Sequence, residues 1–132
     1  MFADLNKLDF YKKIPKSDID IITITEVLEH LQSPFDTLRY IVENKKQSTK
    51  IFVSVPNGGS MGKIILPVVN KQAFYEQDKE HLYSFNHITL KNLLKASGLK
   101  NVKVLPYVQE SHHKVLLSRF PEYASGFVGI GN

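Results

Sequence analysis

Two carboxylates and an imidazole lie close together in the segment DIDIITITEVLEHL. Glu26, Glu29 and His30 are spaced i, i+3 and i+4, so a helical turn would bring them onto one face. Carboxylate oxygens and imidazole nitrogens transfer protons and bind divalent cations. A later histidine, His81, is available as a further member of this group. These residue types predict acid–base or metal chemistry at this point of the chain.

The residues before Glu26 predict the strand that positions this group. Residues 19–25 form a β-branched run, IDIITIT, which is typical of a strand buried on both faces. A helical turn is expected from Glu26 to Leu31, because apolar residues then take helical spacing. Ligands of open α/β sheets bind beyond the carboxyl ends of the strands, so we expect the functional site where this strand ends.

Further strands and helices alternate along the chain. They are expected as a helix from Pro34 to about Lys46 with Ser33 as its N-cap, a strand at 50–56, a helix capped by Thr89 and closed by Gly98, and strands at 102–108 and 126–130. Residues 61–77 are expected as an insertion, and 115–120 as helix or strand. This order predicts one α/β domain over residues 1–132, with a partly parallel sheet.

Composition limits the function classes. The 132 residues contain no cysteine, which excludes a disulfide framework and thiolate metal ligands. The net charge is +4 and the pI about 9.2, but the lysines are scattered, so we expect a solvated surface and no nucleic-acid partner. The longest apolar run, 64–69, is too short to cross a membrane, and the amino terminus lacks signal-peptide features. We therefore expect a cytoplasmic protein without a membrane partner.

Three segments in this order resemble the carboxyl-terminal half of the class I S-adenosylmethionine-dependent methyltransferases. The segments are DIDIITITEVLEHLQSP, KIFVSVPN and DKEHLYSFNHITLKNLLKASGL. They are most similar to the quinone O-methyltransferase-like and methyltransferase-domain groups. The resemblance implies a Rossmann-like sheet in which 19–25 and 50–56 are the fourth and fifth strands. The last two strands would be the sixth and the antiparallel seventh.

The same resemblance implies roles for single residues. S-adenosylmethionine would be the cofactor, and the reaction would methylate an oxygen of a small-molecule acceptor. Thr25 or Glu26 would lie beside the methionine portion of the cofactor, and Asp4 would contact its adenine. Independently of the resemblance, the residue types predict His30 or His81 as the general base for a hydroxyl acceptor. Relatives with E-x-x-E-H also imply a divalent metal, Mg²⁺ or Mn²⁺ with Zn²⁺ or Fe²⁺ as alternatives, held by Glu26, Glu29, His30 and His81.

Two alternatives stay open in the sequence. In the first, Glu29 and His30 bond neighbouring backbone and line the pocket without a metal. The second concerns the Gly-rich cofactor loop of the family, E/D-x-G-x-G-x-G, which is missing because the first glycine is Gly58. The chain is then either a fragment of a longer methyltransferase or a half-domain. A half-domain could be a non-catalytic module that binds a protein partner, through a homodimer or complementing chain at the exposed edge of the fourth strand.

Overall fold

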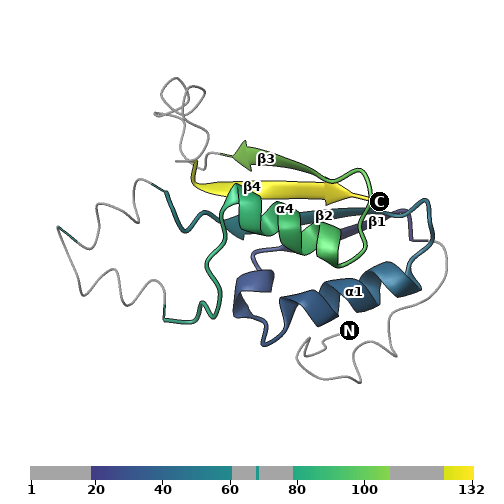
Figure 1. The fold of residues 1–132 in the computed structure, drawn as a ribbon, viewed down its shortest axis with the longest axis horizontal. Helices are drawn as coiled ribbons and strands as arrows, with labels where there is room; N and C mark the ends of the chain where they lie inside the picture. Colours follow the sequence, from purple (N-terminus) through teal and green to yellow (C-terminus); the bar gives the residue numbers. More distant parts are fainter. Residues whose placement is uncertain (1–18, 61–67, 69–78, 108–123) are drawn as a thin grey trace.

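The strands in the described part of the chain form one four-stranded sheet, in the order β1-β2-β4-β3 (Figure 1). The computed structural model describes residues 19–60, 68, 79–107 and 124–132. The strands are β1 (Ile21–Thr25), β2 (Lys50–Pro56), β3 (Lys103–Tyr107) and β4 (Gly126–Gly131). β1 and β2 run parallel, and β4 pairs antiparallel with both β2 and β3. The predicted fold class, a partly parallel α/β sheet with an antiparallel last strand, is confirmed.

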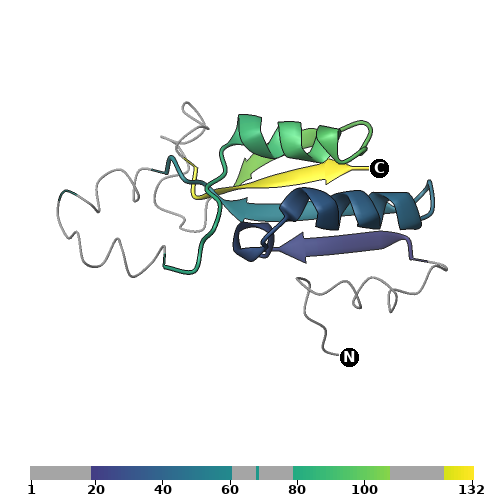
Figure 2. The same ribbon diagram turned by 60° about the horizontal axis from the view of Figure 1, so that its bottom comes forward.

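Both longer helices cover the same face of this sheet, as Figure 2 shows for α1 (Pro34–Asn44) and α4 (His87–Ala96). In β2, Ile51, Val53 and Val55 alternate with partly exposed residues and are buried on this side. Apolar residues of both helices complete the same core. The helices therefore hold the parallel strands in place, and the carboxyl ends of β1 and β2 lie at one edge of the sheet.

The start of α4 corrects the predicted cap. Asn86 is the N-cap, because its Oδ1 accepts hydrogen bonds from the backbone N–H groups of Ile88 and Thr89, both at 2.9 Å. The Thr89 hydroxyl accepts the reciprocal bond from the Asn86 N–H. Thr89 thus occupies the N3 position of a capping box, a position that more often carries Glu or Gln. Gly98, with φ +96°, closes the helix as predicted.

The first strand differs from its predicted environment. It was expected to be buried on both faces, but β1 is the edge strand of the described sheet, and Ile21 is 57% exposed. A β-branched run indicates a strand, and only the neighbouring strands decide whether that strand is central. Asp4, most of the segment 61–77 and the segment 115–120 lie outside the described residues. None of the helices in the described ranges is long and apolar enough to cross a membrane.

Candidate functional site

The chain leaves β1 through Glu26 in an uncommon backbone conformation. Its φ of +51° lies in the left-handed region, which costs a non-glycine residue about 1–2 kcal/mol. The Glu26 N–H donates to the Ser54 carbonyl at 3.1 Å. Its Oε1 accepts hydrogen bonds from the hydroxyls of Ser54, at 2.9 Å, and Tyr107, at 3.0 Å. These contacts tie Glu26 to the carboxyl ends of β2 and β3 and offset its unfavourable conformation.

This conformation contradicts the predicted helical turn from Glu26 to Leu31. The helical part is shorter, a 3-10 turn named η2 that covers Leu28–His30. Glu26 lies outside it, so the i, i+3, i+4 geometry does not form. The predicted turn required α-helical backbone angles at Glu26. Hydrogen bonds from β2 and β3 instead accompany a left-handed φ at this residue.

Glu29 is a buried carboxyl group without a hydrogen-bond partner. The residue is 1% exposed, and within the described part of the chain neither Oε1 nor Oε2 has a partner. Burial raises the pKa of Glu29 above its ordinary value, and the charge of Glu26 adds to this shift. A carboxyl group in such a position is favoured either in its protonated form or, when ionised, with a cation beside it. Glu29 therefore has the environment of a binding or catalytic group.

Two imidazoles lie beside this carboxyl group. His30 Nε2 is 3.9 Å from Glu29 Oε1, and the ring centroids of His30 and His81 are 4.8 Å apart. His30 Nδ1 lies 3.0 Å from the Glu80 carbonyl. Because a carbonyl only accepts, Nδ1 carries the proton in this contact, and the lone pair of Nε2 faces the cluster in the neutral ring. This tautomer is suited to metal binding or proton acceptance.

The backbone of Glu29 brings His81 to the cluster. The Glu29 carbonyl accepts hydrogen bonds from the N–H groups of Leu82, at 2.7 Å, and Tyr83, at 3.2 Å. One donor atom from each of Glu29, His30 and His81 lies within 4.8 Å of the others. The structure thus gathers three of the four predicted metal ligands, hereafter the Glu29 cluster. Glu26 is not in this group and instead bonds Ser54 and Tyr107.

Sequence reasoning did not single out Ser54 and Tyr107. Burial raises the pKa of Tyr107 to about 12, and both the charge of Glu26 and the hydrogen bond to it contribute. The position of each residue could have predicted its place in the site. Each is a polar side chain near the carboxyl end of an otherwise apolar strand. Such residues face the ligand side of an α/β sheet.

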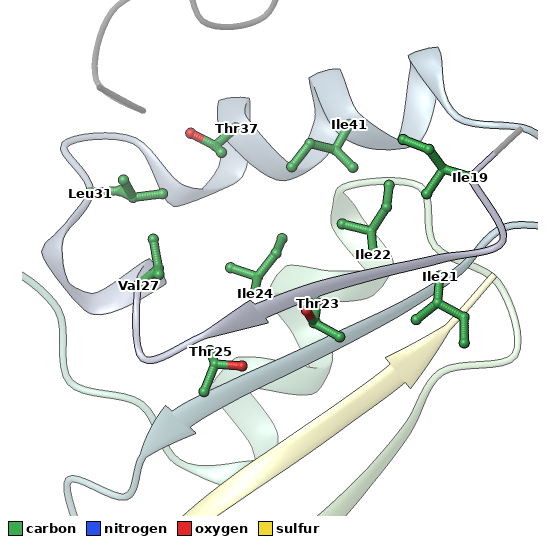
Figure 3. Close-up of a pocket in the computed structure, with 10 residues that line it drawn as sticks. All are labelled: Ile19, Ile21, Ile22, Thr23, Ile24, Thr25, Val27, Leu31, Thr37 and Ile41. Carbon is green, nitrogen blue, oxygen red and sulfur yellow. The ribbon is translucent and has the colours of Figure 1, made fainter. Parts of the chain in front are cut away.

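An apolar groove runs along β1 (Figure 3). It has a volume of about 590 Å³ and extends from β1 to α1. Ten residues line it: Ile19, Ile21, Ile22, Thr23, Ile24, Thr25, Val27, Leu31, Thr37 and Ile41. None of these side chains is acidic or basic. The lining of the groove is therefore apolar, in contrast to the ionisable side chains of the Glu29 cluster.

The edge of β1 also presents backbone groups. Lys50 N–H donates to the Asp20 carbonyl and Glu26 N–H to the Ser54 carbonyl, so the even-numbered residues of this strand face β2. In a parallel ladder the alternate residues face the other way. The N–H and C=O groups of Ile21, Thr23 and Thr25 therefore point to the open edge of the described sheet.

Comparisons with known proteins agree with this geometry. A family profile described as a methyltransferase domain matches residues 3–104. No curated protein sequence matches the chain. Among solved structures, an S-adenosylmethionine-dependent methyltransferase from Archaeoglobus fulgidus has a TM-score of 0.68 and 19% identity, over 99% of this chain and 66% of that one.

Two further structures share the fold at low identity. One is an S-adenosylmethionine-dependent methyltransferase from Thermotoga maritima, with a TM-score of 0.64 and 16% identity, over 92% of this chain and 60% of that one. The other is from a Haloferax volcanii complex of the Trm112 methyltransferase activator with a methyltransferase. Its TM-score is 0.61 and its identity 12%, over 98% of this chain and 58% of that one. The chain thus spans less than two thirds of each of these proteins.

Proposed function

Because the chain belongs to the methyltransferase-domain family, we propose that its protein transfers a methyl group from S-adenosylmethionine to an oxygen atom of a small-molecule acceptor. The observation that carries this proposal is the Glu29 cluster at the carboxyl end of β1. An oxygen acceptor loses a proton when it is methylated, and the cluster contains groups that can take it. In α/β sheets of this kind, ligands bind at this edge.

The reaction assigns a role to the imidazoles. The acceptor oxygen bonds to the methyl carbon while the carbon–sulfur bond breaks, and the electron pair of that bond remains on sulfur, giving S-adenosylhomocysteine. When no metal is bound to these nitrogens, the acceptor proton passes to His30 Nε2 or to the ring of His81. Catalysis otherwise consists of holding the acceptor oxygen in line with the sulfur–methyl bond.

The cofactor is proposed to bind next to the exit from β1. Thr25 ends the strand and lines the groove, and Glu26 follows it at the same edge. These two residues would lie beside the methionine portion of S-adenosylmethionine, with Asp4, outside the described residues, toward the adenine. Both hydrogen bonds to the Glu26 carboxylate end on Oε1. This arrangement favours a contact of Oε2 with a donor group of the cofactor.

The Glu29 cluster fits a divalent metal. The support is the buried carboxyl group without a partner, together with a carbonyl that orients His30 from behind, as in many metal-bound histidines. One carboxylate and two imidazoles favour Zn²⁺ or Fe²⁺, whereas Mg²⁺ and Mn²⁺ prefer oxygen ligands. A bound metal would lower the pKa of the acceptor hydroxyl. The ligands in this proposal are Glu29, His30 and His81.

The function is tested by the formation of S-adenosylhomocysteine from S-adenosylmethionine with a panel of hydroxylated acceptors, followed by mass spectrometry. Removing the base, in His30→Ala or His81→Ala, is expected to lower the turnover rate by about 10²- to 10⁴-fold. His87→Ala is the matched control, since His87 is the first residue of α4 and does not belong to the cluster, and its rate should stay near the wild-type value. Equal rates in all four proteins would contradict the assigned chemistry.

A second candidate function is that of a non-catalytic module that binds a protein partner through β1. It is favoured by the open backbone groups and the apolar groove along that strand. The Haloferax volcanii relative was solved in a complex with an activator protein, which supports a protein partner for this chain too. The partner would be a second copy or a complementing chain.

The module is tested by light scattering after size-exclusion chromatography. Ile21→Lys places a charge on the open edge and is expected to weaken any association by at least about tenfold. Ile88→Lys is the control, because Ile88 is 56% exposed, almost the same as Ile21, but lies on α4. A wild-type chain that stays monomeric and binds S-adenosylhomocysteine in calorimetry would reject the module in favour of the enzyme.

A further inference from the structure

Glu26 lies close to the Glu29 cluster but is held by other partners. Only Val27 and Leu28 separate Glu26 from Glu29 along the chain, and the Glu26 carboxylate is bound by the hydroxyls of Ser54 and Tyr107. Two carboxylates, three residues apart, could bind one cation together. The structure separates them, with Glu29 buried and Glu26 on the exposed rim.

We propose that Ser54 and Tyr107 are positioning residues that hold the Glu26 carboxylate out of the Glu29 cluster, so that a metal there has three protein ligands and an open position. This inference rests on the metal site of the proposed function. Neither the sequence nor the family resemblance assigned this role to Ser54 and Tyr107. Both implied that Glu26 is a metal ligand.

The hydrogen bonds that hold Glu26 come from two different strands. Ser54 lies in β2 and Tyr107 at the end of β3, and both hydroxyls donate to the same oxygen, Oε1, at 2.9 and 3.0 Å. The backbone adds a third restraint, because the Glu26 N–H is bound to the Ser54 carbonyl. A side chain fixed at its backbone and at its carboxylate has little freedom to turn toward Glu29.

Gly126 provides the space that Tyr107 needs. It lies opposite Tyr107 in the β3–β4 ladder. A Cβ atom at position 126 would be 2.5 Å from three atoms of the Tyr107 side chain, including its hydroxyl oxygen. Any larger residue would displace the phenol, so glycine here is required for Tyr107 to reach Glu26.

The number of ligands decides what a metal can do. Zinc with four protein ligands is closed and has a structural role, whereas catalytic zinc keeps three protein ligands and one position for water or substrate. With Glu26 excluded, the Glu29 cluster offers the second arrangement. The acceptor hydroxyl would then take the open position and lie next to the imidazoles.

The test is the double variant Ser54→Ala/Tyr107→Phe, titrated with Co²⁺ by calorimetry and visible spectroscopy. Release of Glu26 is expected to tighten Co²⁺ binding by at least about tenfold. Azide, which occupies open coordination positions, should alter the Co²⁺ spectrum of the wild type but not that of the double variant. Adding Glu26→Gln to the double variant should return the affinity to the wild-type value.

Two further variants keep the test decisive. Gly126→Ala displaces Tyr107 while retaining both hydroxyls, and should tighten Co²⁺ binding in the same direction, even if the double variant folds poorly. Tyr83→Phe is the control, since its hydroxyl bonds the Gln32 carbonyl near the cluster and not Glu26. Its affinity should match the wild type.

Unchanged Co²⁺ affinity in both the double variant and Gly126→Ala would overturn the inference. It would also be overturned if Glu26→Gln alone weakened binding as much as Glu29→Gln, because Glu26 would then already be a ligand. A wild type that binds no Co²⁺ would also reject it, because the inference requires a metal on three protein ligands while Glu26 is held away. The failure of methyl transfer is a separate result, since none of these measurements requires turnover.

Discussion

Replacing Glu29 by glutamine is expected to change the stability of the protein in opposite directions with and without Zn²⁺. Without metal, the buried carboxyl group has no hydrogen-bond partner in the described structure, and its ionised form destabilises the fold. The neutral amide should raise the free energy of unfolding at neutral pH by about 1–3 kcal/mol. With Zn²⁺ at a hundred times its dissociation constant, the wild type should gain about 2.7 kcal/mol, and the variant should lose most of that gain.

The first of these effects depends on pH, and its sign follows from the raised pKa of Glu29. The folded chain holds the Glu29 proton more tightly than the unfolded chain, whose carboxyl group titrates near the ordinary value of 4.5. This stabilisation is complete below that value and is lost as the pH rises through the higher pKa of the folded state. Glu29→Gln should therefore differ little from the wild type in acid and exceed it at neutral pH.

Urea unfolding at several pH values, with a chelator and then with Zn²⁺, measures both effects. Glu43→Gln is the control, because Glu43 is exposed on α1 and pairs only with Arg39 in the contacts found on that surface. It should leave the metal response unchanged. A loss of stability in Glu29→Gln at neutral pH without metal would contradict this prediction and would mean that the carboxylate is compensated without a metal, for example by the imidazoles of His30 and His81.

The elements of the fold follow from local sequence patterns. The strand at 50–56 was predicted with the bounds that β2 has, because an apolar run is bounded by lysine and by the Pro-Asn-Gly-Gly turn. Ser33 and Pro34 likewise marked the start of α1, where Ser33 accepts a bond from the Asp36 N–H. In both cases the determining interactions lie within a few residues of the chain.

The candidate site depended on contacts that no local pattern contains. The conformation of Glu26 is set by Ser54 and Tyr107, which are 28 and 81 residues away in sequence. By contrast, the pairing of Glu29 with His30 was predictable from adjacency, and His81 joined through the backbone bond from Leu82 to Glu29. The residue types of the cluster could be predicted from the sequence, but the exclusion of Glu26 required the sheet.

Leu28→Ala is expected to lower the free energy of unfolding by about 2–5 kcal/mol, with Zn²⁺ or without it. Leu28 is fully buried in η2, between Glu26 and Glu29, and its side chain belongs to the main core. Deleting it leaves a cavity that the short turn cannot fill, because the hydrogen bonds of its two neighbours fix the backbone on either side.

Urea unfolding with a chelator and with Zn²⁺ also distinguishes packing from ligand binding at this turn. Ile21→Ala is the control for lost apolar surface, since Ile21 is 57% exposed on β1, and a small change is expected. If η2 serves mainly to hold the Glu29 cluster, Leu28→Ala should also weaken Zn²⁺ binding, whereas Ile21→Ala should not. A loss of stability with unchanged Zn²⁺ affinity would show that the ligands are held by the backbone bonds to Leu82 and Tyr83 rather than by the core beneath them.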